Sequence, residues 1–169
     1  TYNGYTGEKM TVVLAKALLY THFNKKAEEL ALEDYKPGDK LIPFKVVGEY
    51  KGPDLVGMEY EQLIPWVKPV TVDENGKWQE AAGEAFRVIP GDYVTTEDGT
   101  GIVHIAPTFG ADDAFVARAA GIPSLFMINK KGETRPMVDL TGKFYLLDEL
   151  DEAFVKECVD VEKYKEYQG

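Results

Sequence analysis

The chain has 169 residues, of which 44% are hydrophobic and 28% are charged, the mix of an ordinary globular protein. This composition excludes a collagen, a disordered tail and a disulfide scaffold. No apolar run approaches the roughly 18 residues that a membrane helix needs. A count of 19 basic against 29 acidic residues gives a net charge of −10, so any contact with RNA requires a local patch or a larger host protein. The single cysteine, Cys158, cannot form an internal disulfide and favours a reducing, cytoplasmic location.

The N-terminus has neither an initiator Met nor the charged and apolar regions of a signal peptide, so we expect a piece of a longer protein. In the first half of the chain, segments rich in β-branched residues are separated by charged segments. Helical spacing predicts a helix over 15–23, and the charged stretch 24–39 predicts an exposed helix and turn. Extended segments are predicted at 10–14, 41–50, 58–63 and 67–72. The Asn-Gly pair at 75–76 is a hairpin signal.

The second half contains sharper patterns. Strands are predicted at 86–89, 93–96 and 101–106, followed by a helix over 112–120 that Gly121 and Pro123 end. An extended piece at 125–128, a turn at 130–132 and a terminal helix from about 150 to 167 complete the chain. We find no internal repeat or linker. The pattern predicts one mixed, β-rich domain with a few helices packed against it.

Several hydrolytic mechanisms are excluded by the residues available. The only serine, Ser124, lies outside the Gly-x-Ser-x-Gly turn that exposes a nucleophile. Cys158 has acidic neighbours, which raise the pKa of its thiol and suppress the thiolate. His22, His104 and Cys158 lack any paired ligand spacing, so we predict no metal site.

The segment from Gly99 to Pro123 is the best candidate for a site. Gly99-Thr100-Gly101 lacks the third glycine of a dinucleotide fingerprint and the Lys of a phosphate loop, so it favours a turn. A strand carrying His104 runs into a bend, and a helix bearing Asp112 and Asp113 follows. Such a junction places free backbone groups at a cleft.

Two interpretations of these side chains remain open. An ionised carboxylate at the start of a helix suits an ammonium group on a ligand. Alternatively, Asp112 is an N-cap, Asp113 complements the helix dipole, and His104 is a core histidine with its hydrogen bonds satisfied.

The motif from 99 to 113 resembles the signature of the editing domain of isoleucyl-tRNA synthetase. It reads Gly-Thr-Gly-Ile-Val-His-Ile-Ala-Pro-Thr-Phe-Gly-Ala-Asp-Asp. Related valyl enzymes tend to carry Lys, and leucyl enzymes Met, where this chain has His104. Both also tend to carry His-Asp where it has Phe109-Gly110. The likeness is therefore to the isoleucyl branch, in its eukaryote-like subtype. The segments 50–60 and 88–95 resemble the family as well.

Two departures accompany the resemblance. Ile105 stands where many members have Thr. A Thr-rich strand with the motif Thr-Thr-Pro-Trp-Thr lies, in the family, a few tens of residues before the point where this chain begins. The resemblance therefore implies that residues 1–169 are an editing-domain fragment lacking that strand. The implied fold is the class I synthetase editing fold, a barrel-like core with peripheral α-helices.

The resemblance also implies an activity. The parent enzyme ligates isoleucine to its tRNA using ATP and Mg²⁺, and its pocket rejects valine poorly because one methylene is worth only about 1–3 kcal/mol, for which this enzyme family is the standard example. The editing domain hydrolyses the mischarged valyl-tRNA(Ile) with an ordered water, helped by backbone groups and the terminal ribose hydroxyl. It needs no cofactor or metal of its own.

The site residues follow by analogy with the family. Asp113 and His104 are the implied catalytic residues: Asp113 holds the α-ammonium of the misattached valine, and His104 restricts the side-chain pocket. Gly101, Ile105 and Phe109 join Asp113 in binding the substrate. The implied partners are the aminoacylated tRNA 3′ end and the rest of the synthetase chain, with no membrane.

Three alternatives remain. In the first, the fragment is a non-catalytic module that binds the tRNA acceptor end. In the second, it is the equivalent domain of a valyl- or leucyl-tRNA synthetase, and in the third it is an unrelated β-rich interaction domain.

Overall fold

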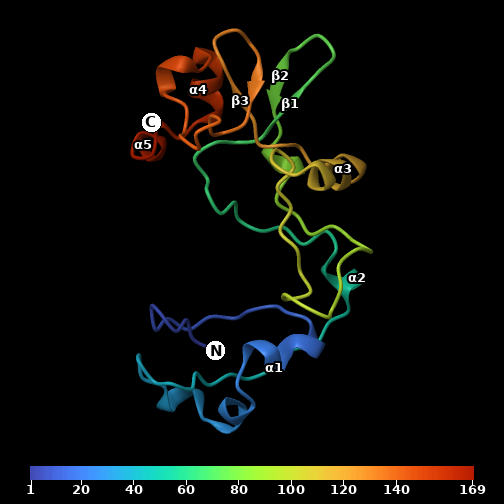
Figure 1. Ribbon diagram of the computed structural model, residues 1–169, viewed down its shortest axis with the longest axis vertical. Coiled ribbons are helices and arrows are strands. Elements are labelled where there is room, and N and C mark those ends of the chain that lie inside the picture. The colour runs from blue at the N-terminus through green and yellow to red at the C-terminus, as the bar shows by residue number, and fades with distance from the viewer. The chain divides into compact units, whose positions relative to one another are not determined.

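The computed structural model describes residues 1–169, and the chain enters each of two compact units twice. Unit 1 comprises Thr1–Leu55 and Pro90–His104, and unit 2 comprises Val56–Ile89 and Ile105–Gly169. The secondary structure is mixed, with short helices and two separate two-stranded sheets (Figure 1). None of the helices has the length and hydrophobicity needed to cross a membrane.

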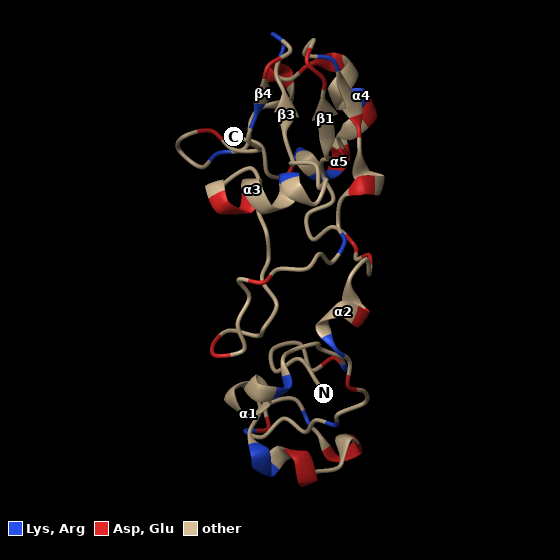
Figure 2. Ribbon diagram, turned by 90° about the vertical axis from the view of Figure 1, so that its right-hand side faces the viewer, with Lys and Arg blue, Asp and Glu red and all other residues tan.

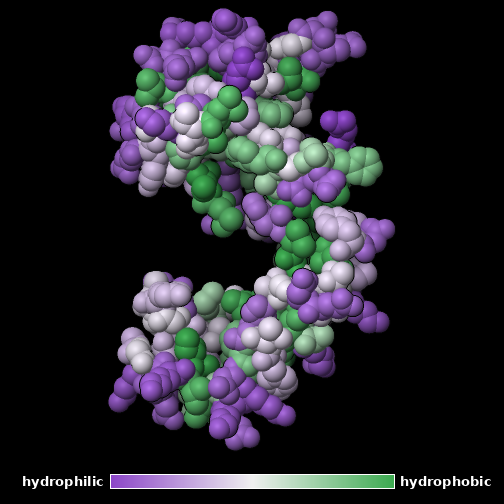
Figure 3. Space-filling model, in the orientation of Figure 1, coloured by the Kyte–Doolittle hydropathy of each residue, from purple (hydrophilic) through white to green (hydrophobic).

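Unit 2 is built around two antiparallel hairpins. Strand β1 (Val70–Val72) pairs with β2 (Trp78–Glu80), and β3 (Met127–Ile128) pairs with β4 (Thr134–Arg135). The first hairpin closes at the Asn-Gly pair predicted from the sequence, where Gly76 has φ 78° and the Asp73 carboxylate accepts backbone N–H bonds from residues 75 and 77. Figure 3 shows hydrophilic side chains covering both hairpin tips.

The core of unit 2 lies between these hairpins and two short helices, α4 (Glu152–Cys158) and α5 (Val161–Tyr164). The buried cluster consists of Val67, Val70, Met127, Ile128, Met137, Leu150, Phe154, Cys158 and Tyr164. Phe154 is fully buried and meets the Trp78 ring edge-on, with centroids 5.7 Å apart. Burial, aided by the charge of Glu149, raises the pKa of Tyr164 to about 12, so this phenol stays neutral and donates to the Tyr145 carbonyl.

Helix α3 (Ala111–Ala119) also belongs to unit 2 and confirms the helix predicted at 112–120. It ends as the sequence predicts, at Gly121 with φ 69°. The N–H of Ile122 donates to the Ala117 carbonyl and that of Gly121 to the Arg118 carbonyl, which is the pattern of a glycine-terminated helix.

Unit 1 contains only short helical turns. They are η1 (Lys16–Leu18), α1 (Leu19–His22), η2 (Lys25–Glu29), η3 (Leu32–Asp34) and α2 (Gly52–Leu55). Leu18, Ala27 and Phe44 are buried there, and the Phe23 and Phe44 rings lie 4.8 Å apart. The first two turns occupy most of the predicted helix 15–23, while the next two break the predicted 24–39 helix into separate pieces.

The structure corrects the prediction of a β-rich fold with a barrel-like core: no closed barrel is present. The segments 10–14, 41–50, 93–96 and 101–106 have strand composition but form no ladder. Residues 86–88 pair only briefly with 57–60, through the bridge between Glu59 and Arg87. β-Branched residues favour extended backbone, but a strand also needs a neighbour for its N–H and C=O groups.

The predicted terminal helix is also corrected, because it is interrupted at Val159. This residue is extended and bridges to Val67. Asp160 then caps α5 by accepting the N–H of Lys163. The helix breaks because the chain instead pairs Cys158 and Asp160 with the backbone of residues 66 and 68.

Replacing Phe154 by Ala tests the assignment of this core. We expect a loss of about 3–5 kcal/mol in the free energy of unfolding, because the change leaves a cavity against Trp78. The matched control is Leu140→Ala: Leu140 is fully exposed, so its loss should stay within about 0.5 kcal/mol. Urea denaturation of both variants measures the difference, and equal losses would contradict the core described.

Candidate functional site

The bend between residues 105 and 110 is held to the start of α3 by Asp113. One carboxylate oxygen, Oδ2, accepts the N–H of Ala106 at 2.9 Å. The Ala106 carbonyl in turn accepts the N–H groups of Phe109 and Gly110, at 3.0 and 3.1 Å. Asp113 is partly buried and lies so close to Gly110 that a Cβ there would meet Oδ2 at 2.8 Å. The bend therefore requires both the carboxylate and the glycine.

The second oxygen of Asp113, Oδ1, accepts no hydrogen bond from the protein. A carboxylate fixed through one oxygen can still offer the other to a cationic ligand. The group lies in the first turn of α3, where a negative charge complements the helix dipole. The geometry thus supports both of the interpretations left open for Asp113.

Asp112 differs from its neighbour. It is exposed and makes no side-chain hydrogen bond, and the N-cap of α3 is Gly110 rather than Asp112. The prediction that Asp112 caps the helix is therefore wrong, because the helix begins one residue before it. Successive helical residues point about 100° apart, so the two carboxylates face different directions. Figure 2 shows the acidic start of α3.

The Gly-Thr-Gly turn lies in unit 1, where it packs against the N-terminal segment. The N–H of Ala15 donates to the Thr100 carbonyl at 2.8 Å, and His22 Nε2 lies 2.5 Å from the Gly99 carbonyl. Gly101 has φ 74°, and a Cβ there would meet the Ala15 Cβ at 2.6 Å. The predicted turn is confirmed, and Gly101 is required by backbone conformation and by space. Its role in substrate binding stays a prediction.

The remaining predicted site residues are placed as follows. His104 is exposed, lies in irregular backbone rather than on a strand, and makes no hydrogen bond, so the interpretation as a satisfied core histidine is wrong. It ends the unit 1 segment, whereas Asp113 belongs to unit 2, and their shared cleft stays a prediction. Ile105 is partly buried, and Phe109 is 65% exposed.

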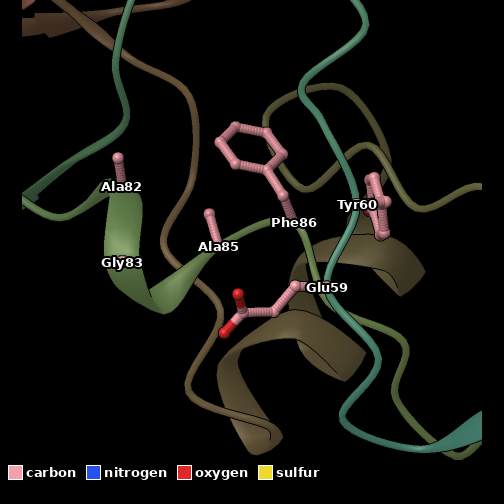
Figure 4. Close-up of a pocket in the computed structure, with 6 residues that line it drawn as sticks. All are labelled: Glu59, Tyr60, Ala82, Gly83, Ala85 and Phe86. Atoms are coloured by element: carbon pink, nitrogen blue, oxygen red, sulfur yellow. The ribbon is translucent and has the colours of Figure 1, made fainter.

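A small open hollow lies elsewhere in unit 2, between the 59–60 segment and the turn η4 (Ala82–Glu84) (Figure 4). It has a volume of about 150 Å³ and is lined by Glu59, Tyr60, Ala82, Gly83, Ala85 and Phe86. Phe86 has φ 55°, a left-handed conformation that is costly for an aromatic residue. None of the predicted site residues lines this hollow.

Arg87 is a residue that sequence reasoning missed. Its Nη2 donates to the Ala120 carbonyl at the C-terminal end of α3 at 3.1 Å, and its Nη1 lies 3.4 Å from a carboxylate oxygen of Glu84. A guanidinium at this end complements the helix dipole and fixes the helix that carries Asp113. The only signal in the sequence is a cation within the otherwise apolar segment 86–89.

The thiol of Cys158 is buried in the unit 2 core. Burial, reinforced by the charges of Glu157 and Glu80, raises its pKa to about 11. The predicted rise in pKa is confirmed, and desolvation contributes more to it than the neighbouring charge. The chain brings together no group of three His, Cys, Asp or Glu side chains that could hold a metal ion.

Comparisons with known proteins relate the sequence of the chain to one enzyme family. No protein-family model matches the chain. The chain is 84% identical over 169 residues to the isoleucine–tRNA ligase of Bacteroides thetaiotaomicron and 73% identical over 170 residues to that of Bacteroides fragilis. It is 52% identical over 171 residues to the isoleucine–tRNA ligase of Porphyromonas gingivalis. Each alignment covers the whole chain but only 14% of the relative.

Because the alignments cover the whole chain at high identity, the chain is homologous to a segment of an aminoacyl-tRNA synthetase, an enzyme of the ligase class. The particular synthetase whose segment it matches is isoleucine–tRNA ligase. The chain spans about 14% of the length of these relatives.

Alanine substitutions in the Gly-Thr-Gly turn test the packing of that turn. Gly101→Ala introduces both a strained φ and a clash with Ala15, whereas at Gly99 a Cβ meets nothing within 4 Å. We expect Gly99→Ala to cost about 1–2 kcal/mol from the left-handed backbone alone, and Gly101→Ala to cost about 1–3 kcal/mol more. Hydrogen exchange of the Ala15 N–H, which is bonded to Thr100, reports the difference. Similar exchange in both variants would contradict the close contact.

Proposed function

We propose that this chain is the editing domain of an isoleucine–tRNA ligase of the eukaryote-like subtype, and that it hydrolyses valine misattached to the isoleucine tRNA. The observation that carries the proposal is Asp113: its carboxylate is fixed through Oδ2, while Oδ1 is free. Homology to isoleucine–tRNA ligases and the signature resemblance at 99–113 support valyl-tRNA(Ile) as the substrate that this carboxylate binds. The parent enzyme attaches isoleucine to its tRNA using ATP and contributes to protein synthesis.

The chemistry assigned to Asp113 is binding and orientation. The substrate is an aminoacyl ester with a free α-ammonium, and Oδ1 accepts a charge-assisted hydrogen bond from it. Water then attacks the ester carbonyl carbon, and the bond from that carbon to the ribose oxygen breaks. One proton of the water goes to the ribose oxygen and the other to solvent, so free valine and uncharged tRNA result. No protein nucleophile takes part. Ser124 lies outside a nucleophile turn, and the raised pKa of Cys158 keeps its thiol protonated near neutral pH.

The roles of the remaining residues follow from the need of an editing site to admit valine and exclude the larger isoleucine. His104 forms part of the wall that excludes the larger isoleucine side chain, and its exposed ring is available for that contact. Ile105, Phe109 and Gly101 complete the substrate site. ATP and Mg²⁺ are assigned to the synthetic site elsewhere in the parent enzyme, as the family resemblance implies.

The extended segments without partners support a further part of the proposal. Residues 10–14, 41–50 and 101–106 have strand composition but pair with no strand, and the backbone of 11–14, 41–50 and 103–105 makes no hydrogen bond within the chain. A Thr-rich strand from another segment of the parent enzyme would supply hydrogen-bonding partners and complete the editing fold. The proposed partners are the 3′ end of the aminoacylated tRNA and the rest of the synthetase chain, in the cytoplasm.

The test of the proposal separates the charge of Asp113 from its role in the bend. Asp113→Asn keeps an oxygen that can accept the Ala106 N–H but removes the negative charge. In the full-length enzyme, we expect hydrolysis of valyl-tRNA(Ile) to fall roughly 10- to 150-fold, since a hydrogen bond to a charged group is worth about 1.5–3 kcal/mol. Aminoacylation should survive, so mischarged valyl-tRNA accumulates. Deacylation of pre-charged tRNA measures the effect.

Asp112→Asn is the matched control, because Asp112 is exposed and bonds to nothing. It should leave deacylation within about twofold of the wild type. If the Asp112 variant loses hydrolysis and the Asp113 variant keeps it, the assignment of the two acids is wrong. If both keep it, neither carboxylate takes part in hydrolysis, and the role proposed for Asp113 is wrong.

His104→Ala tests whether the histidine ring excludes the isoleucine side chain from the editing site. Removing the ring widens the pocket, so correctly charged isoleucyl-tRNA should begin to be hydrolysed while valyl-tRNA hydrolysis persists. The ratio of the two deacylation rates in the full-length enzyme is the measurement. Asp113 recognises a group common to both esters, so its variants should leave that ratio unchanged. Unaltered discrimination in the His104 variant would show that this histidine has no part in exclusion.

A further inference from the structure

Helix α3 has an outer face dominated by one exposed aromatic ring. The side chain of Phe115 is 75% exposed, although burying such a ring is worth about 1.5–3 kcal/mol. Its helical neighbours three and four residues away are also exposed: Ala111, Asp112, Arg118 and Ala119. The two alanines are too short to cover the ring, so both sides of it stay open. Figure 3 shows hydrophobic surface over α3 among hydrophilic side chains.

An arginine without an ion-pair partner lies one helical turn from Phe115. Arg118 is one turn from Phe115, a spacing that puts their Cβ atoms about 5–6 Å apart. Its guanidinium makes no ion pair and no side-chain hydrogen bond. Arg87 binds the Ala120 carbonyl at the same end of the helix. In a chain of net charge −10, the last turn of α3 carries one basic residue, whereas its first turn is acidic, and Figure 2 shows both charges on the helix.

We propose that the outer face of α3 binds a nucleotide of the single-stranded 3′ end of the tRNA, with the base stacked on Phe115 and a phosphate on Arg118. The inference rests on the proposed function, which makes that RNA end the substrate. Flat bases stack on aromatic rings, and the guanidinium fork matches phosphate. A protein partner would need a broader apolar patch than one ring between Asp112 and Arg118.

The position of the face agrees with its proposed use. Asp113 and Phe115 are two residues apart and therefore point about 200° apart around the helix. The terminal aminoacyl group at Asp113 and an upstream nucleotide at Phe115 then lie on opposite sides of a helix about 10–12 Å across. A short run of nucleotides wraps around the beginning of α3, so that stacking fixes the strand while Asp113 orients the ester.

Kinetics of the full-length enzyme on pre-charged valyl-tRNA(Ile) test the contact. Phe115→Ala should raise KM roughly five- to 150-fold, the range for removing a base-stacking ring, with kcat largely kept because Asp113 is intact. Phe115→Trp should restore KM. Arg118→Gln should also raise KM and reduce the slope of log KM against log salt by about 0.7, the loss of one phosphate contact on a single strand. The controls, Leu140→Ala and Lys131→Gln, change exposed residues away from α3 and should alter neither.

A second readout does not depend on hydrolysis. Uncharged tRNA carrying 5-iodocytidine at the penultimate position should photo-crosslink to a peptide containing Phe115, and Phe115→Ala should abolish the crosslink. If the crosslink forms while Asp113→Asn hydrolyses valyl-tRNA(Ile) normally, the role proposed for Asp113 fails and the RNA contact stands. An unchanged KM together with no crosslink overturns the inference. So does a large drop in the melting temperature of Phe115→Ala, which would show that the ring packs against protein.

Discussion

The hydrogen bond from the Ala106 N–H to the Asp113 carboxylate is the constraint on which the candidate site depends. It closes the bend before α3, and it leaves room at residue 110 only for glycine. The same bond lets one side chain serve two purposes. Oδ2 is committed to the backbone and immobilises the group, while Oδ1 remains free for a ligand. Because the carboxylate is already ordered, binding a cation there costs little further side-chain entropy.

The far end of α3 is fixed just as firmly. Gly121 ends the helix with backbone hydrogen bonds, and Arg87 binds the carbonyl of Ala120. Negative charge at the start and positive charge at the end both complement the helix dipole. The helix that presents Asp113 is therefore held by local interactions at each end, although only Ala117 along it is buried. Its orientation depends less on core packing than on these terminal contacts.

Features that arise from neighbouring residues could be predicted from the sequence. The Asn-Gly hairpin, the turn at 130–132, helix α3 and its stop at Gly121 all depend on interactions within a few residues. Strands at 10–14 and 101–106 could not be predicted correctly, because their composition indicates extended backbone but says nothing of a partner. The interruption at Val159 has the same origin: its bridge to Val67 spans more than 90 residues.

The same distinction applies to the site. The motif led to Asp113, but only the structure shows its bond to Ala106, the contact of Gly101 with Ala15, and the role of Arg87. Each of these joins residues through space in a way that composition does not encode. Arg87 and Ala120 are 33 residues apart. Phe115 could not be predicted for a different reason: an apolar residue within a helix is expected to face the core, whereas this side chain faces solvent.

The acidity of the chain fits the use proposed for it. A net charge of −10 repels RNA in general, so one ring and one guanidinium group on α3 give only weak affinity for a free strand. Within the parent enzyme, the remaining protein delivers the acceptor end, and a tethered end reaches a high effective concentration. Weak contacts then suffice for the strand to visit the site. Tight binding would be harmful, because correctly charged tRNA must also leave unhydrolysed. A fixed carboxylate, a small stacking surface and a repulsive net charge together favour weak binding. Such a site can bind each charged tRNA briefly and release the correctly charged one.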